Sequence, residues 1–543
     1  MAEPTFHLAD LWETLVDASP DGECLVADPV RHTRASLDAA ANRVAHALLA
    51  RGIQPGDHVG IYARNRAEYV ESLLGCWKIS ARPININWRY VVDELRYVIA
   101  DADIRAMIIE REYLPLLDEL ADEIPELKAC LVLEDGDTAT TSRLATERYE
   151  DVLAVASDRR GFDAPRTADD VYMLYTGGTT GMPKGVMWRH EDFFFACVMG
   201  GNPMGAPIES PAAIAANASP VFPLDALILG PLMHGGGQWL SLIALYSGNR
   251  AIVSTQRSFD AVGVLDLIHR ERPTTIGLIG DAMGRPIAEA ALAEPGRWDL
   301  TSLVSIGNGG AMLTASIKDQ LRAAFPNAMM SDSFGASETG AAGREFEDGS
   351  SKAGPAFTSD GNTSVLDPDT LEPREPGSPD QGMLARKGHI PLGYWNDPDK
   401  TAKTFRVDAR GTRWVIPGDF ALLDEQGRIV LLGRGSGCIN SGGEKIFPEE
   451  VEAAIRSHPA VFDAVVVGVP DERFGQKVVA LVALRDGVDE ITLDDIQTHC
   501  RTKIAGYKVP RELLLGVAPR TNVGKPDYAN AATIARQRLG IDV

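Results

Sequence analysis

Hydrophobic residues along this chain come in short runs that alternate with amphipathic stretches. Apolar runs at 58–63, 106–109 and 129–133 have the length of buried strands. Residues 35–51 and 67–79 repeat apolar positions at helical spacing. The alternation returns further along, with strand-like runs at 250–253, 275–279 and 303–306. Strands that alternate with helices predict parallel sheets covered by helices, so the expected fold class is α/β.

The pattern changes near residue 350. Between 350 and 434, Gly and Pro are frequent and the apolar runs are short, which predicts a small β region. After it, a helix opening at Pro448 and a strong strand at 464–469 predict a compact α+β unit. We therefore predict two domains. Residues 1–434 form a large domain of parallel-sheet α/β subdomains plus the β region, and residues 435–543 form a small C-terminal domain.

Composition narrows the class of protein. The 543 residues are 45% apolar and 24% charged, which is typical of a soluble globular protein. The net charge of −23 argues against a nucleic-acid or anionic-membrane partner. The apolar stretch 221–246 is interrupted by proline, glycine and aspartate, so it predicts a buried strand and loop rather than a membrane span. Scattered cysteines and an N-terminus without a signal pattern predict a cytoplasmic protein without integral membrane association.

The most informative motif is a loop rich in glycine and threonine at 175–185, with the sequence YTGGTTGMPKG, which follows an apolar run at 171–175. Glycine lets backbone N–H groups turn toward an anion, and threonine hydroxyls donate to phosphate oxygens. Lys184 adds a positive charge. The loop fails the Walker pattern, because Pro183 precedes the lysine and Gly185 follows it. The loop therefore predicts a binding site for nucleotide phosphates that is not of the Walker type.

Three later motifs suit the rest of a nucleotide. The run 333–339 reads SFGASET, which offers an aromatic ring for a purine and a carboxylate for a divalent cation, although it also fits a turn into a helix. Residues 309–311 follow a strand and either receive an adenine edge or form a tight turn. Asp419 and Arg434 fit a ribose diol as acceptor and donor. Each motif alone is more often structural.

Together and in this order, the motifs resemble the adenylate-forming superfamily of acyl-CoA synthetases, firefly luciferase and peptide-synthetase adenylation domains. The resemblance extends from about residue 37 to residue 528. The phosphate loop and the sequence CINSGGEK at 438–445 are similar to a bacterial acyl-CoA synthetase branch that includes ligases for steroid side-chain acids. The resemblance implies that a carboxylate and Mg-ATP form an acyl-adenylate and pyrophosphate, after which a thiol takes the acyl group. It also implies that the small C-terminal domain is mobile.

The resemblance also implies roles for individual residues. ATP is expected to contact Thr176, Gly177, Gly178, Thr179, Thr180, Gly181, Lys184, Gly309, Gly310, Ala311, Ser333, Phe334, Gly335, Ser337, Asp419 and Arg434. Glu338 is expected to hold Mg²⁺, and Lys525 to serve the adenylation step. Gly442 and Gly443 would line the path of the CoA pantetheine arm. His234 would gate the acyl pocket, although a histidine at this position could equally be a packing residue.

Some positions depart from the pattern of the family. Pro417 stands before the Gly-Asp pair, and Pro526 follows the late lysine. Ser436 and Gly437 replace the charged residues usual at the hinge between the domains. None of these changes removes a charged catalytic group, but they leave the energetics of the hinge and the turnover open. We predict that the small domain rotates relative to the large one through changes in the backbone dihedral angles at Ser436, between Gly435 and Gly437.

The function expected is that of an AMP-forming carboxylate–CoA ligase acting on a hydrophobic acid, either a long-chain fatty acid or a steroid side-chain acid. Its substrates would be the acid, ATP and coenzyme A, with Mg²⁺ as cofactor. The glycines at 235–237 favour a long or bulky acid over acetate. Two alternatives stay open: an adenylation enzyme that loads a carrier protein in trans, and a nucleotide-binding sensor without ligase activity. A homodimer is also open.

Overall fold

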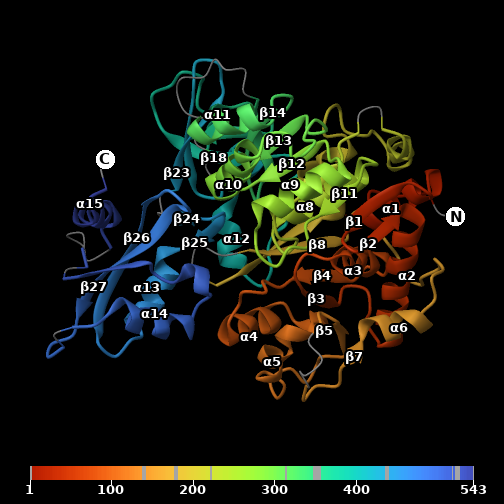
Figure 1. Ribbon diagram of the computed structural model, residues 1–543, viewed down its shortest axis with the longest axis horizontal. Coiled ribbons are helices and arrows are strands. Elements are labelled where there is room, and N and C mark those ends of the chain that lie inside the picture. Colours follow the sequence, from red (N-terminus) through yellow and green to blue (C-terminus); the bar gives the residue numbers. More distant parts are fainter. Residues whose placement is uncertain are drawn as a thin grey trace.

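The computed structural model describes residues 3–541 except for ten short stretches or single positions. Those are 137–141, 177–181, 221–222, 312, 314, 347–355, 435–438, 489, 517 and 520–525, together with the side chains of several neighbouring residues. Figure 1 shows a large N-terminal part and, at its edge, a small C-terminal part that carries α13, α14 and α15. The predicted hinge residues Gly435, Ser436 and Gly437 lie outside the described residues, so the domain boundary stays a prediction.

A parallel five-stranded sheet forms the first α/β subdomain of the described chain, with strand order β4-β3-β5-β6-β7. Its strands are β3 (His58–Tyr62), β4 (Arg82–Asn85), β5 (Ile104–Glu110), β6 (Ala129–Leu133) and β7 (Glu147–Arg148). Its helical elements are α2 (Arg34–Ala50), α3 (Ala67–Lys78), α4 (Val92–Asp101), η1 (Arg111–Tyr113), α5 (Leu114–Asp118) and α6 (Tyr149–Val155). The predicted alternation of strands and helices is confirmed here.

An eight-stranded sheet forms the second subdomain within the described residues, in the order β15-β14-β13-β12-β10-β11-β1-β2. Its pairs are parallel except at the two edges, where β2 and β15 run antiparallel. The strands are β1 (Glu23–Ala27), β2 (Val30–Thr33), β10 (Ala226–Ile228), β11 (Ala251–Val253), β12 (Thr275–Leu278), β13 (Ser305–Asn308), β14 (Met329–Ala336) and β15 (Gly340–Phe346). The helices are α8 (Gly235–Tyr246), α9 (Ala261–Glu271), α10 (Gly280–Ala293) and α11 (Ala315–Ala324).

A small antiparallel sheet lies beside these subdomains. It consists of β8 (Val171–Thr176), β9 (Lys184–Arg189) and β19 (Gly393–Tyr394), and it is followed by α7 (His190–Cys197) after β9 and α12 (Pro398–Thr404) after β19. The predicted small β region is confirmed as a further sheet. Its strands are β16 (Ala356–Phe357), β17 (Thr363–Leu366), β18 (Gly382–Arg386), β20 (Phe405–Val407), β21 (Arg413–Val415), β22 (Asp419–Leu423) and β23 (Ile429–Arg434).

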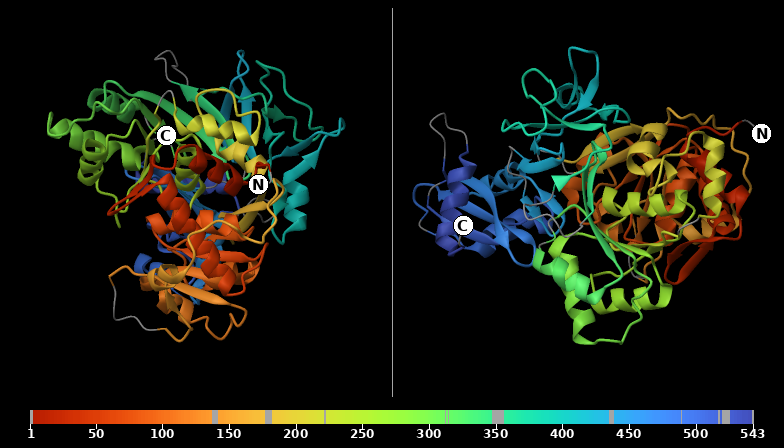
Figure 2. Two further views of the ribbon diagram at one scale, coloured as in Figure 1. Left: turned by 90° about the vertical axis from the view of Figure 1, so that its right-hand side faces the viewer. Right: turned by 90° about the horizontal axis from the view of Figure 1, so that it is seen from above.

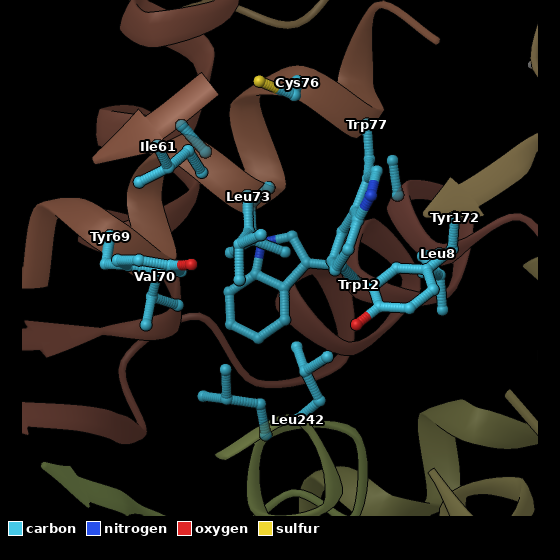
Figure 3. Packing of buried hydrophobic residues seen from close by; sticks show 14 of the residues in the cluster. Leu8, Trp12, Ile61, Tyr69, Val70, Leu73, Cys76, Trp77, Tyr172 and Leu242 are labelled. Atoms are coloured by element: carbon cyan, nitrogen blue, oxygen red, sulfur yellow. The ribbon is translucent and has the colours of Figure 1, made fainter. Parts of the chain in front are cut away.

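The largest hydrophobic core lies between the two α/β subdomains. It joins residues of α1 (Leu8–Ala18), α2, α3 and α8 to both sheets, including Ile61 from the five-stranded sheet and Ile228 from the eight-stranded one. Figure 3 shows Trp12, Trp77 and Leu242 gathered in this core. Because this core joins the helices to both sheets, it fixes the two sheets relative to each other.

The C-terminal part is a sheet covered on both faces. Along β26, alternate residues belong to two cores: Val466 packs with residues of α13 and α14, whereas Val465 and Val467 pack with residues of α15. This two-residue period is the reason that a continuous valine run forms a strand buried on both faces. The elements are β24 (Ile439–Ser441), β25 (Glu444–Ile446), α13 (Pro448–Arg456), β26 (Val461–Asp471), β27 (Gly475–Leu484), α14 (Leu493–Arg501), β28 (Glu512–Leu515) and α15 (Tyr528–Leu539).

One predicted segment was wrong. We expected 221–246 to be a strand and loop, but β10 is followed by the twelve-residue helix α8. The helix begins with three glycines, which have low helix propensity. Gly237 is required by packing, because a Cβ there would lie 2.5 Å from the carbonyl oxygens of Gly230 and Pro231. Short 3₁₀ turns complete the described elements at η2 (Met199–Gly201), η3 (Pro211–Ala218) and η4 (Gly506–Lys508).

Among the residues described by the structure, no helix is both long and apolar enough to cross a bilayer. Figure 2 shows the same two parts from the side and from above, with α15 at the outer face of the C-terminal part.

Because β26 is buried on both faces, substitutions at its buried and exposed positions should change the stability of the protein by different amounts. Replacing the fully buried Val466 with Ala should cost about 2 kcal/mol, because two buried methyl groups are lost and a cavity is left. Phe462→Ala on the same strand removes a side chain that is 69% exposed and should change stability by less than about 0.5 kcal/mol. Hydrogen exchange of the β26 amides in the full chain measures both changes. Equal effects of the two variants would contradict the packing described.

Candidate functional site

The predicted phosphate loop connects two paired strands. β8 and β9 are antiparallel, and their register places Thr176 opposite Lys184. Tyr172 to Tyr175 are buried, which confirms the predicted strand before the loop. The loop residues Gly177, Gly178, Thr179, Thr180 and Gly181 lie outside the described residues. Lys184, which the sequence suggested to be in the loop, is the first residue of β9 and is therefore held by the strand.

Lys184 has a carboxylate partner that sequence analysis did not find. Its Nζ donates to Oδ2 of Asp397 at 2.8 Å, and the lysine side chain is only 11% exposed. Asp397 caps α12, because its other carboxylate oxygen accepts the backbone N–H of Lys400 at 2.9 Å. Burial pushes the pKa of Asp397 upward, but the hydrogen bond and charge of Lys184 and the Lys400 amide outweigh it and lower the pKa. The Asp397 side chain is therefore favoured as a carboxylate.

Glu338 lies close to the same cluster. It belongs to the turn between β14 and β15, and its Oε1 accepts a hydrogen bond from the Tyr394 hydroxyl at 2.9 Å. The ammonium of Lys184 lies 5.6 Å from the centre of the Tyr394 ring. Burial and the charge of Lys184 lower the pKa of Lys400, whereas Glu338 and Asp397 act in the opposite direction. The structure thus brings two predicted site residues together and adds Tyr394, Asp397 and Lys400.

The two predicted adenine motifs are neighbours. The turn Gly309–Ala311 follows β13, which pairs with β14. Ser333 donates its hydroxyl hydrogen to the Asn308 carbonyl at 3.1 Å, and a Cβ on Gly309 would lie 3.1 Å from the Ser333 hydroxyl oxygen. Gly310 has a φ of +77°, which favours glycine. Residues 309–311 and 333–335 therefore lie side by side at the carboxyl end of β13.

The next residues on β14 are tightly packed. Phe334 meets the ring of Phe357 edge to face, with ring centres 4.7 Å apart, and its side chain is half-buried. A Cβ on Gly335 would lie 2.2 Å from the Gly340 carbonyl oxygen, so only glycine fits at this irregularity in the β14–β15 pair. Trp188 of β9 donates to the Ser337 carbonyl at 3.0 Å. This bond ties the paired strands β8 and β9, called the phosphate hairpin from here on, to the turn that carries Ser337 and Glu338.

Asp419 and Arg434 are cross-strand partners, as their predicted joint role requires. Asp419 opens β22 and Arg434 ends β23, and the antiparallel register places them opposite each other. The side chain of Arg434 is outside the described part of the structure, so only its backbone position is known.

The Gly442–Gly443 turn of the C-terminal part lies against the N-terminal part. Both glycines have positive φ, +60° and +86°. A Cβ on Gly443 would lie 2.2 Å from Cγ2 of Ile279, the residue that precedes α10. A glycine is therefore needed at 443 for two reasons: the backbone conformation and the close approach of Ile279.

The next residue, Glu444, binds two residues of the N-terminal part. Its Oε1 lies 3.2 Å from Nε2 of His234 and also accepts from Arg89. Burial alone would raise the pKa of Glu444, but His234, Arg89 and Lys508 outweigh it and lower the pKa to about 2. His234, at 36% side-chain exposure, precedes the first turn of α8. The predicted gate residue and the predicted pantetheine glycines are thus in one place.

Lys525 lies outside the described residues. The helix that begins soon after it, α15, packs on the outer face of the C-terminal sheet against β26 and β27 (Figure 1). Strands β24 and β25, which the Gly442–Gly443 turn joins, lie on the side of this small part away from α15 (Figure 1), and Gly443 meets Ile279 of the N-terminal part.

Comparison with known protein families agrees with this arrangement. A family model described as "AMP-binding enzyme" matches residues 12–395, which is more than two thirds of the chain. A second, described as "AMP-binding enzyme C-terminal domain", matches residues 450–525. This protein belongs to the AMP-binding enzyme family. The resemblance found in the sequence motifs is thereby confirmed.

Two curated relatives of this AMP-binding enzyme are similar over nearly the whole chain. One is the medium/long-chain-fatty-acid–CoA/3-oxocholest-4-en-26-oate–CoA ligase of Mycolicibacterium smegmatis, 42% identical over 99% of this chain and 98% of its own. The other is the 3-oxocholest-4-en-26-oate–CoA ligase of Rhodococcus rhodochrous, 44% identical over 96% of this chain and 94% of its own.

Solved structures share the fold. The amide bond synthetase McbA from Marinactinospora thermotolerans superposes with a TM-score of 0.79 at 25% identity and covers 96% of this AMP-binding enzyme and 99% of McbA. The predicted fold class is confirmed: parallel-sheet subdomains and a small β region precede a small α+β C-terminal domain.

The packing at Gly335 predicts an effect on nucleotide binding. Gly335→Ala should displace the turn that carries Ser337 and Glu338, because the new Cβ would overlap the Gly340 carbonyl. We expect AMP affinity, measured by isothermal titration calorimetry, to fall at least about tenfold, the equivalent of about 1.4 kcal/mol. Gly506→Ala, where a Cβ meets nothing within 4 Å, is the control. Unchanged AMP affinity in Gly335→Ala would exclude this turn from the nucleotide site.

Proposed function

We propose that this protein is an ATP-dependent carboxylate–CoA ligase that forms AMP and pyrophosphate. One observation carries the proposal: the Gly442–Gly443 turn lies against Ile279, and the next residue, Glu444, contacts His234, within the same molecule that carries the phosphate hairpin. A nucleotide-binding sensor would not need a second segment of the chain, in addition to the phosphate hairpin, at the site. The names of the curated relatives, which are CoA ligases at 42% and 44% identity, support the same reaction.

In the first half-reaction the carboxylate of the acid attacks the α-phosphate of ATP, and pyrophosphate leaves. Both reactants are anions, so the site must neutralise charge and hold them in line. Lys184 is suited to the phosphates, because Asp397 and β9 fix the ammonium in position before ATP arrives. The adenine would lie along 309–311 and 333–335, and the ribose between Asp419 and Arg434.

Mg²⁺ is proposed as the metal, held by Glu338. The donor set fits this ion. Glu338 offers one carboxylate, and among the described residues no group of three or more His, Cys, Asp or Glu side chains could form a cage. Mg²⁺ typically takes one or two carboxylates, and substrate phosphates and water complete its shell. When bound, it would neutralise phosphate charge. Tyr394 would keep the Glu338 carboxylate pointing toward the phosphate hairpin.

In the second half-reaction the CoA thiol attacks the acyl carbonyl and AMP leaves. We propose that the pantetheine arm passes the Gly442–Gly443 turn, where a larger side chain would meet Ile279. Glu444 would hold this turn in place through Arg89 and His234. Lys525 would serve only the first half-reaction, so the small domain would rotate about residues 435–437 between the two steps.

The acid is proposed to be hydrophobic, a long-chain fatty acid or a steroid side-chain acid. The names of the relatives support both classes. A Cβ on Gly236 would meet nothing within 4 Å, so the start of α8 leaves room beside His234. Transfer to a carrier protein in trans is the less favoured alternative. The cytoplasm, where ATP and CoA are abundant, is the proposed location, and a homodimer stays a hypothesis.

A panel of acids tests the proposed function. AMP release that depends on both CoA and the acid should be greatest, by specificity constant, with long-chain fatty or steroid side-chain acids. Acetate or propionate as the best substrate would contradict the choice of acid. Phosphate or ADP in place of AMP and pyrophosphate would contradict the reaction itself.

Two variants should separate the half-reactions in opposite directions. Lys525→Ala should abolish acid-dependent ATP–pyrophosphate exchange but spare the reaction of CoA with a supplied acyl-adenylate. Gly443→Val should do the reverse, since the new side chain would overlap Ile279. If both variants lost both half-reactions equally, the assignment of the two segments to separate steps would be wrong.

A further inference from the structure

Lys508 is buried between two glutamates at the contact of the N-terminal and C-terminal parts. Its Nζ donates to Oε1 of Glu94 and to Oε1 of Glu450, each at 2.6 Å. The side chains of Lys508, Glu94 and Glu450 are 4%, 3% and 8% exposed. Both distances are those of strong, charge-assisted hydrogen bonds.

The two carboxylates come from different parts of the molecule. Glu450 lies on α13 and Lys508 ends η4, so this pair belongs to the C-terminal part and stays together in any orientation of it. Glu94 lies in the first turn of α4, in the N-terminal part, where its second oxygen also accepts the N–H of Val91 at 3.2 Å. Of the two bonds that Lys508 donates, only the one to Glu94 depends on how the two parts are oriented.

The charge of Glu94 changes the pKa values of both Lys508 and Glu450. Burial alone would lower the pKa of Lys508, but the charges of Glu450 and Glu94 outweigh it and raise the pKa above its usual value. The pKa of Glu450 rises to about 7, because burial and the charge of Glu94 together exceed the stabilising effect of Lys508. Two acids thus share one lysine when the parts are in contact.

We infer that the Glu94–Lys508 pair is a latch that holds the C-terminal domain in the orientation for thioester formation. The inference rests on the proposed function, because it is the Gly442–Gly443 turn, proposed for the CoA step, that this orientation brings to the site. Glu94 and Lys508 are positioning residues: they act through the placement of that turn. The latch is additional to the Arg89–Glu444 contact, which holds the turn itself.

The arrangement suits a contact that must open and close in every turnover. A buried charge that loses its only partner is costly, whereas an intact buried pair contributes modestly. When the domain rotates away, Lys508 keeps Glu450, and Glu94 meets water. Opening therefore leaves Lys508 paired with Glu450 and exposes Glu94 to water, so the latch can open without a large penalty.

A charge reversal tests the latch. Glu94→Lys places two lysines opposite each other, so we expect thioester formation from a supplied acyl-adenylate to fall at least about tenfold. Acid-dependent ATP–pyrophosphate exchange should stay within about twofold. Glu126→Lys is the matched control, because it makes the same charge change at a side chain that is 76% exposed and pairs with Arg105 of the same part.

A double variant separates the latch from local damage to α4. Glu94→Lys with Lys508→Glu restores one lysine between two acids across the contact, so thioester formation should recover relative to Glu94→Lys. Loss of the Val91 contact alone would not be rescued by a change at position 508. No recovery, or an equal loss of both half-reactions in Glu94→Lys, would overturn the latch, as would a rate equal to that of the Glu126→Lys control.

Hydrogen exchange supplies a readout that does not depend on activity. In the full chain without substrates, Glu94→Lys should raise exchange at the amides of 90–95 and 505–509, and Glu126→Lys should not. If the unsubstituted protein formed no acyl-adenylate, the proposed function would fail, yet this measurement would still decide the contact. Unchanged exchange at both segments in Glu94→Lys would contradict the latch.

Discussion

The segment from Gly393 to Thr404 holds the candidate nucleotide site together. Its Tyr394 hydroxyl binds Glu338 on the β14–β15 turn, and its Asp397 binds Lys184 at the start of β9. The Trp188–Ser337 bond closes the same connection from the other side. The proposed phosphate ligand Lys184, on the three-stranded sheet, and the proposed metal ligand Glu338, on the β14–β15 turn, are thereby fixed before any substrate arrives. This pre-organisation is what a reaction between two anions requires, since the geometry and charge must be set in advance.

The charge distribution explains how an acidic protein can serve an anionic nucleotide. The net charge is −23, yet Lys184 and Lys400 lie near each other beside the phosphate hairpin, held by Asp397. At the contact between the domains, buried acids and bases lie together in the same way: Glu444 with Arg89 and His234, and Lys508 with Glu94 and Glu450. Local pairing, rather than net charge, determines what each surface binds.

Helices and strands could be predicted from the sequence where one hydrophobic pattern dominates a segment. The valine run of β26 and the apolar run before the phosphate loop both form the expected strands. Sequence reasoning failed at α8, because three glycines at the start of a helix carry little helix signal, and the packing of Gly230 and Pro231 against Gly237 is not visible in the sequence. It also missed Asp397, whose local sequence resembles an ordinary helix cap. Its partner, Lys184, is 213 residues away, and no local pattern can report such a contact.

The proposed function requires one site to carry out two chemically different steps in a fixed order. A single-turnover experiment with rapid quenching, a long-chain fatty or steroid side-chain acid, Mg-ATP and enzyme in excess tests it most directly. Without CoA, an acyl-adenylate should accumulate in an amount close to that of the enzyme sites. Addition of CoA should then convert it to acyl-CoA and AMP. If acyl-CoA appeared with ADP, or if no acyl-adenylate preceded it, the account would be contradicted.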